Sequence, residues 1–103
     1  MRRQVQIWTD EWVRDELRPG AALRVNRILS RVMADMDWLA SLGSDGYRRL
    51  DRRGKVPMNV WLSEVLVRNL KMIAVEKDMS LSLFLHLALV YGVMQGYHLE
   101  EVA

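Results

Sequence analysis

The 103-residue chain contains no cysteine, so disulfide bonds and zinc sites with cysteine ligands are excluded. It also lacks a long apolar run. The most apolar stretch, residues 81–94, is interrupted by Ser82, His86 and Gly92, and it is shorter than the roughly 20 residues of a membrane-spanning helix. The first four residues carry two arginines and a glutamine in place of the apolar core of a secretory leader. We therefore expect a cytoplasmic protein without a membrane partner.

Side chains that carry out catalysis are also few. The two histidines, His86 and His98, have no pair of carboxylates beside them, and the chain has no glycine-rich phosphate loop and no nucleophile next to a base. Half of the residues are apolar, which suits a folded domain and not a disordered chain. We therefore expect one compact domain that is not an enzyme and that uses no metal or cofactor.

The formal net charge is only +2, but the basic residues are concentrated in the first half of the chain. They form three groups: one at the N-terminus, one along residues 24–31, and one in a segment rich in glycine and arginine. Their members are Arg2 and Arg3, then Arg24, Arg27 and Arg31, then Arg48, Arg49, Arg52, Arg53 and Lys55. Such groups suit contact with a polyanion. The alternative for each arginine is a plain solvated surface.

Two short segments of the chain follow the same pattern. Residues 5–11 (VQIWTDE) and residues 58–64 (MNVWLSE) share alternating apolar and polar positions, a tryptophan and a glutamate, at a constant offset of 53 residues (58 − 5 = 53). Alternation with period two is typical of a half-buried strand. Asp10 and Ser63 follow the alternation, and such residues cap the N-termini of helices. Each segment therefore predicts a strand that leads into a helix.

The repeat continues through a further helix. Residues 23–29 align with residues 79–85, and the larger offset there gives the second unit the longer first helix. In the first unit we expect the first helix to end near Arg18, before Pro19 and Gly20. A long helix from about Arg24 to Leu39 should then bury Val25, Ile28, Leu29, Val32 and Met36.

The second unit is predicted to hold one helix as far as Lys77 and another from Leu81 to about Gln95, with Ser80 as its N-cap. This last helix is apolar on nearly every side, so it is either buried or covered by a partner. Because a lone strand leaves its N–H and C=O groups unpaired, the two strands should pair with each other. The sequence therefore predicts a mostly α fold with a two-stranded antiparallel β-ribbon and one shared core.

The chain is expected to form a single domain, residues 1–103. Within it, the two strand-helix-helix units occupy residues 3–40 and 56–95. A basic connector covers residues 41–55, and a short acidic tail covers residues 96–103.

These units resemble the ribbon-helix-helix DNA-binding family of the Arc and MetJ type. In the second unit the resemblance is carried by residues 60–64 (VWLSE), Leu66 and Leu70, and residues 79–82 (MSLS) followed by Phe84, Leu85, Ala88 and Leu89. In the first unit it is carried by the strand and by residues 25–29. Family members dimerise through a ribbon that enters the major groove. This chain looks like such a dimer fused into one polypeptide, and the resemblance implies that its partner is double-stranded DNA.

The outward face of the predicted ribbon carries amides and tryptophans. A two-stranded ribbon fits the major groove, and Gln or Asn can form paired hydrogen bonds with adenine. We therefore predict that contacts with bases come from Gln4, Gln6, Trp8, Asn59 and Trp61.

The resemblance implies phosphate contacts at the N-terminus of the last helix of each unit, where unpaired amides and the helix dipole favour an anion. These positions are Arg24, Val25 and Asn26 in the first unit and Ser80, Leu81 and Ser82 in the second. Arginines near the ribbon and in the connector are expected to add contacts that weaken with salt. They are Arg2, Arg3, Arg48, Arg49, Arg52 and Arg53.

The two matched tryptophans leave alternatives open. Family ribbons usually display Arg, Lys or Thr on this face, whereas this chain has Trp8, Trp61 and Pro57 there. A tryptophan can contact a thymine methyl group, but a pair of exposed tryptophans also suits a protein partner. A register shift of one residue would turn both into the core.

The sequence thus favours sequence-specific DNA binding, as a small transcriptional regulator such as a repressor or as a plasmid or phage accessory factor. The alternative is a protein-interaction module on the same scaffold. It would use the tryptophan face, or it would bind a partner or a second copy through Leu83, Leu87 and Val90. That helix face is closed instead if the segment after the first unit folds over it through Trp38, Leu42, Tyr47 and Leu50.

Overall fold

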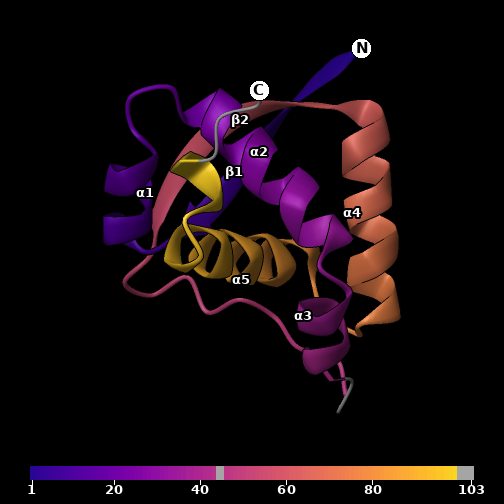
Figure 1. The fold of residues 1–103 in the computed structure, drawn as a ribbon. Coiled ribbons are helices and arrows are strands. Elements are labelled where there is room, and N and C mark those ends of the chain that lie inside the picture. The colour runs from indigo at the N-terminus through magenta and orange to yellow at the C-terminus, as the bar shows by residue number, and fades with distance from the viewer. Residues whose placement is uncertain (44–45, 100–103) are drawn as a thin grey trace.

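The computed structural model describes residues 1–43 and 46–99, and its elements run strand-helix-helix twice, with a short extra helix between the two sets (Figure 1). They are β1 (Arg2–Thr9), α1 (Glu11–Leu17), α2 (Ala21–Ala34), α3 (Met36–Ser41), β2 (Val56–Ser63), α4 (Glu64–Glu76), α5 (Leu81–Met94) and a 3-10 helix, η1 (Tyr97–Leu99). The predicted mostly α fold with a two-stranded ribbon is confirmed. Parts of the predicted connector (residues 44–45) and tail (residues 100–103) lie outside the described residues.

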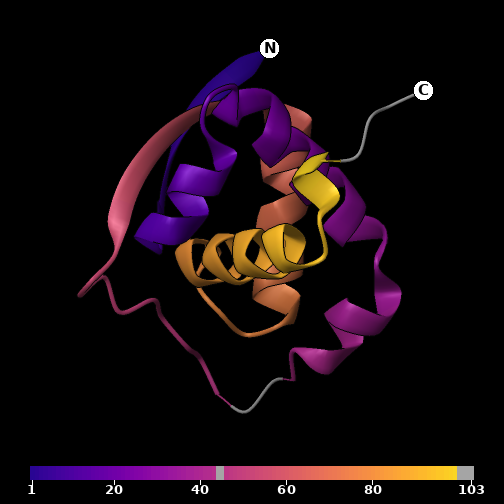
Figure 2. The same cartoon turned by 60° about the vertical axis from the view of Figure 1, so that its left-hand side comes forward.

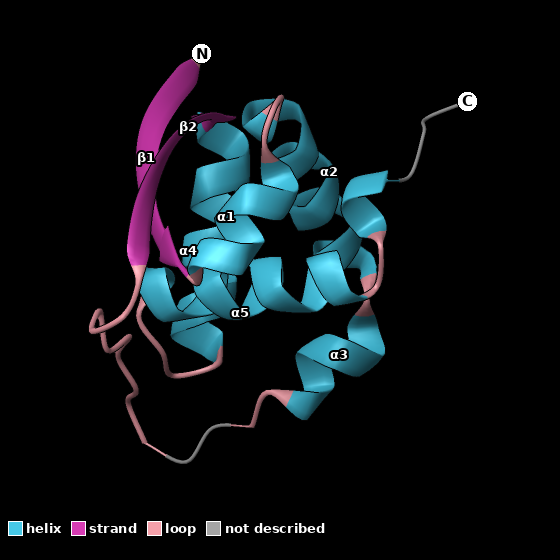
Figure 3. Ribbon diagram, turned by 90° about the vertical axis from the view of Figure 1, so that its left-hand side faces the viewer, coloured by secondary structure: helices cyan, strands magenta, loops and turns pink. Residues whose placement is uncertain are grey.

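The ribbon pairs β1 with β2 in antiparallel orientation, and it runs along one side of the helices (Figure 3). Gln6 lies opposite Asn59 in the middle of the ribbon. The side chains that alternate with these point toward the helices, and the buried ones are Ile7, Thr9, Met58, Val60 and Leu62. This register keeps the apolar face inward, so the one-residue shift that would bury both tryptophans does not occur.

Helix α5 lies at the centre of the molecule, between α1 and α4 (Figure 1). It packs against α2 and β1 as well, which explains why it is apolar on nearly every side. Helix α2 in turn packs on β2. Buried residues from both halves of the chain therefore belong to one hydrophobic cluster.

The two long helices α2 and α5 approach most closely at Gly92. A Cβ atom on Gly92 would overlap with Cγ2 of Ile28. Ile28 is fully buried, so it has no open space into which to move. A residue without a side chain is therefore required at this crossing.

The predicted long helix from Arg24 to Leu39 is wrong at both ends. Helix α2 begins at Ala21 and ends at Ala34, and Gly20 is its N-cap with a φ of 84°, in the left-handed region that glycine tolerates. Met36, predicted to be buried, is 70% exposed because it lies beyond the end of α2.

Asp35 ends α2 and starts α3. Its Oδ1 accepts the N–H of Trp38 at 3.1 Å, while its Oδ2 accepts the hydroxyls of Tyr91 at 2.5 Å and Tyr97 at 3.1 Å. These bonds, that of Tyr91 first, hold the pKa of Asp35 below its usual value. The sequence pattern could not reveal this junction, because both tyrosines come from the far end of the chain.

The other predicted helix ends are confirmed. Ser63 and Ser80 cap α4 and α5 by accepting the N–H groups of Leu66 and Leu83. Asp10 stands at the N-cap position of α1 but accepts no capping bond, and it forms an ion pair with Lys55 at 3.1 Å. The predicted tail begins with η1, in which His98 is buried.

Residues 46–55 of the connector follow the outside of the molecule as far as β2 (Figure 2). Over the described residues, none of the helices combines the length and the apolar character needed to cross a bilayer.

The close approach of α2 and α5 predicts that Gly92→Ala destabilises the protein by about 1–3 kcal/mol, although the same change stabilises an ordinary exposed helix by about 1 kcal/mol. Urea denaturation followed by circular dichroism measures this. Ile28→Ala removes Cγ2 of Ile28, the methyl group that the new side chain would meet. The double variant should therefore lose less stability than the sum of the two single losses. Additive losses, or a stabilising Gly92→Ala, would contradict the packing.

Candidate nucleic-acid interface

The outer face of the ribbon is polar at its centre and has a tryptophan toward each end. Gln4, Gln6 and Asn59 are exposed, and Gln4 lies opposite Trp61. Trp61 is 52% exposed, whereas Trp8, which lies opposite Pro57, is only half-buried and is partly covered by other groups. The predicted base-reading residues therefore share one face, with amide groups at its centre.

Trp8 holds its neighbour Gln6 in place. The Nε1–H of Trp8 donates to Oε1 of Gln6 at 3.2 Å, and the guanidinium of Arg52 lies 5.1 Å from the Trp8 ring centre. A side-chain amide oxygen has two lone pairs, so Gln6 can still accept one more bond and donate from its NH2 group. This arrangement orients a donor and an acceptor toward solvent and brings one connector arginine to the ribbon.

A hollow of about 440 Å³ lies where the other end of the ribbon meets α2. It is lined by Arg2, Ala22, Leu23, Asn26, Trp61 and Ser63. Leu23 is 59% exposed, so it forms an apolar wall together with Trp61. The amide of Asn26 donates to the C=O groups of Ala22 at 2.6 Å and Trp61 at 3.4 Å, which ties the start of α2 to β2.

The first turn of α2 differs from the prediction. The helix begins three residues before Arg24, so its unpaired amides are those of Ala21, Ala22 and Leu23, and no side chain caps them. Val25 is fully buried inside the helix and cannot reach a phosphate. The sequence reasoning misses Leu23 and Ala22 because it treats Gly20 only as a helix breaker, although glycine also serves as an N-cap.

The start of α5 is more enclosed than the start of α2. Oγ of Ser80 already accepts the N–H of Leu83, and the N–H of Ser80 donates to the C=O of Arg48 in the connector at 2.9 Å. Leu81 and Ser82 are half-buried. The two helix N-termini that the resemblance treats as equivalent therefore differ in access.

The connector arginines have different environments. Arg48 is half-buried, and its Nη2 donates to the C=O groups of Leu42 at 3.0 Å and of Gly43 and Lys77 at 3.4 Å. It therefore ties the ends of α3 and α4 together, and this guanidinium is occupied by backbone carbonyls instead of being presented to a phosphate.

Two other connector arginines also have protein partners. Arg53 forms an ion pair with Asp51 at 2.7 Å, and this bond holds the pKa of Asp51 below its usual value. The guanidinium of Arg49 lies 5.5 Å from the ring centre of Tyr47. Both arginines stay exposed, in contrast to Arg48.

The apolar helix face of Leu83, Leu87 and Val90 is not open. All three are half-buried and pack against the hydrophobic cluster. Trp38 and Leu42 also pack against this cluster, and Trp38 stacks on Tyr91 with a ring-centre distance of 4.9 Å. Tyr47, expected in the same cover, is exposed.

The end of the ribbon at Thr9 is fixed by a polar pair on its core side. Thr9 is fully buried, and its Oγ1 shares a hydrogen bond of 3.0 Å with Nδ1 of His86 on α5. Burial lowers the pKa of His86 below its usual value, while Asp10 opposes this effect and Lys55 adds to it. His86 thus supports the ribbon from the core side.

No cluster of three or more His, Asp or Glu suited to a metal ion occurs in residues 1–43 and 46–99. Comparison of the chain with protein-family models, curated proteins and solved structures finds no match. The candidate interface therefore rests on its own residues: an amide-rich ribbon face, flanking tryptophans and the uncapped N-terminus of α2.

The bonds of Arg48 predict that Arg48→Ala lowers the free energy of unfolding by about 1–3 kcal/mol, because it leaves backbone carbonyls without a charged donor. Arg49→Ala is the matched control, since Arg49 is exposed and its guanidinium lies over the ring of Tyr47. Urea denaturation of both variants measures the difference. Equal stability of the two variants would contradict the structural role of Arg48.

The environment of His86 predicts a loss of stability in mild acid. The folded state holds the pKa of His86 below the unfolded value of roughly 6.5, so the unfolded chain binds more protons between the two values and stability falls as the pH drops through that window. Urea midpoints at about pH 7.5 and about pH 5.5 measure this. The loss of stability between these pH values should be smaller in His86→Gln. An equal loss in this variant would show that His86 does not cause it.

Proposed function

We propose that this chain binds double-stranded DNA in a sequence-specific manner through its β-ribbon, as a small transcriptional regulator or a plasmid or phage accessory factor. The observation that carries this proposal is the register that sets Gln6 opposite Asn59 at the centre of an exposed ribbon face. A two-stranded ribbon fits a major groove about 12 Å wide, and side-chain amides bond both N6 and N7 of adenine. The centre of the ribbon thus offers the groups that such reading needs.

We further infer that the chain is a tandem ribbon-helix-helix pseudo-dimer. The repeat offset that relates Trp8 to Trp61 also relates Gln6 to Asn59, and these last two residues face each other in the ribbon. A two-fold axis through this central pair would exchange the two strands. In keeping with it, the second helix of each unit packs on the strand of the other unit, α2 on β2 and α5 on β1.

The ends of the ribbon supply candidate phosphate contacts. The uncapped amides of α2 open onto the hollow beside Trp61 and Arg2, and unpaired amides at a helix N-terminus favour an anion. Arg52, held over Trp8, supplies a cation at the opposite end. Because these two ends are chemically different, the target site is expected to lack a palindrome, unlike that of a symmetric dimer.

A protein-interaction module is the second candidate, and one observation favours it. Trp61 and Leu23 are both more than half exposed and line the same hollow, which gives an apolar surface beside the polar ribbon face. A partner that docks there would bury tryptophan, the residue most enriched at binding hot spots. DNA binding depends steeply on salt, whereas docking on this apolar surface does not.

The proposal predicts that Gln6→Ala/Asn59→Ala abolishes sequence selectivity. Removing both central amides leaves the ribbon without its paired donors and acceptors, at a cost of roughly 1–3 kcal/mol for each base that is no longer bonded. The measurement is fluorescence anisotropy on duplexes selected from a random pool with the natural protein, at two salt concentrations.

Asn69→Ala/Gln95→Ala is the matched control, because these amides are exposed on α4 and at the end of α5, away from the ribbon face. The control should bind the selected duplexes as the natural protein does. Failure to enrich any duplex, with only weak association that salt removes, would refute the proposal and favour the interaction module. In that case Trp61→Ala and Leu23→Ala become the variants to test.

A further inference from the structure

Three basic side chains gather at the end of the ribbon next to α4. Arg3 of β1 and Arg68 and Lys71 of α4 line a hollow of about 200 Å³, together with Glu64 and Val67. The N–H of Glu64 donates to the C=O of Met1 at 3.1 Å, which fastens the start of the chain to the first turn of α4. This bond brings Arg3, from the start of the chain, close to Arg68 and Lys71, which lie one turn apart on α4.

These three cations are not neutralised within the protein. Across residues 1–43 and 46–99, no side-chain hydrogen bond or ion pair engages Arg3, Arg68 or Lys71, and all three are exposed. Among the described residues that line the hollow, Glu64 is the one carboxylate against three cations, so this lining carries an excess of positive charge. Like charges repel, and their convergence in one hollow therefore favours an anion that offers several oxygens, such as a phosphate.

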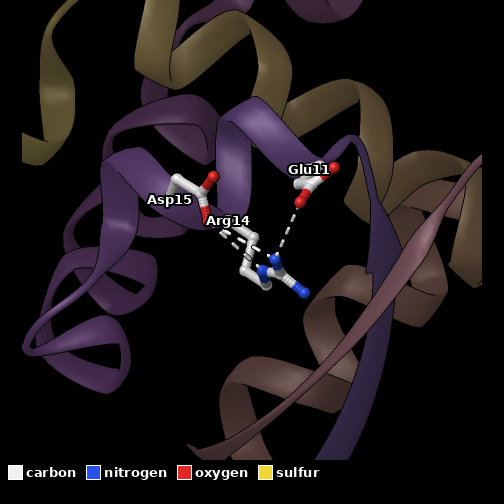
Figure 4. Close-up of polar contacts among 3 residues, drawn as sticks. All are labelled: Glu11, Arg14 and Asp15. Atoms are coloured by element: carbon white, nitrogen blue, oxygen red, sulfur yellow. Dashed lines mark hydrogen bonds and ion pairs between the residues drawn. The ribbon is translucent and has the colours of Figure 1, made fainter.

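The opposite side of the molecule carries less positive charge at the corresponding positions. Helix α1 lies on that side (Figure 1). The repeat offset relates Asp15 of α1 to Arg68, and it relates Arg18, the residue after α1, to Lys71. Arg14 on α1 is already paired with Glu11 at 3.4 Å and with Asp15 at 3.5 Å (Figure 4). The α1 side therefore has a carboxylate, Asp15, at the position that corresponds to Arg68, whereas the position that corresponds to Lys71 is basic on both sides.

We propose that Arg3, Arg68 and Lys71 bind a phosphodiester group of the DNA backbone beside the ribbon, and that the α1 side makes no equivalent contact. The DNA is then held asymmetrically, with more backbone contacts beside α4 than beside α1. This inference rests on the proposed function, because it places the ribbon in a duplex groove.

The test compares the salt dependence of DNA binding between variants. Each cation that contacts a phosphate adds roughly 0.9 to the slope of log Kd against log salt. Arg68→Ala/Lys71→Ala should therefore lower this slope by about 2, and it should weaken binding by the same factor on every sequence. Arg68→Lys/Lys71→Arg keeps both charges and should restore the slope.

The matched control uses the position that corresponds to Lys71. Arg18→Ala removes one charge from the α1 side and should leave the slope unchanged, whereas Lys71→Ala should lower it by about 1. Neutral methylphosphonate linkages placed along one flank of the duplex at a time identify the phosphate. Binding should weaken on one flank only, and that weakening should disappear in Arg68→Ala/Lys71→Ala.

Each outcome separates this inference from the proposed function. An unchanged slope in the double variant, together with loss of selectivity in Gln6→Ala/Asn59→Ala, overturns the phosphate contact and leaves DNA reading intact. If the natural protein binds no DNA, titration with inorganic phosphate, followed by NMR of the Arg and Lys side chains, decides whether the hollow binds a free anion. A saturable shift that the double variant lacks supports an anion site, and no shift refutes it.

Discussion

The pairing of β1 with β2 is the constraint on which the rest of the molecule depends. Neither strand can form the hydrogen bonds of its backbone N–H and C=O groups alone, so each needs the other. In the sequence the two strands are separated by α1, α2, α3 and the connector. Once the strands pair, β1 packs on α5 of the other half, and β2 packs on α2 of the other half. The halves therefore cannot fold as separate bodies, and a single core follows from a single ribbon.

The same register decides what the outer surface can do. Because alternate residues point to opposite faces, fixing Ile7 and Val60 in the core also fixes Gln6 and Asn59 outside. Neighbouring residues fix the groups on this face further. Trp8 orients the side chain of Gln6. Asn26 ties the backbone of Trp61 to α2. A polar surface carried by a two-stranded ribbon is thus held in place by apolar packing behind it.

Local patterns in the sequence predicted what is local in the structure. The strands, the caps at Ser63 and Ser80 and the ends of α4 and α5 follow from alternation and helix chemistry. The predictions were wrong where contacts between residues far apart in the sequence determine the local structure. Asp35 breaks α2 through Tyr91 and Tyr97, and the carbonyls around Arg48 come from two helix ends. The hollow lined by Arg3, Arg68 and Lys71 required knowing that Met1 bonds Glu64.

Both strands of the ribbon belong to one polypeptide, and this has a consequence for how the protein can change over time. Pairing is intramolecular, so the ribbon persists at any dilution, whereas a ribbon shared by two chains dissociates when the chains are scarce. A substitution in one strand also leaves the other strand as it was. Each half of the surface can therefore change independently, and the two ends of the ribbon face already differ, with Pro57 opposite Trp8 and Gln4 opposite Trp61.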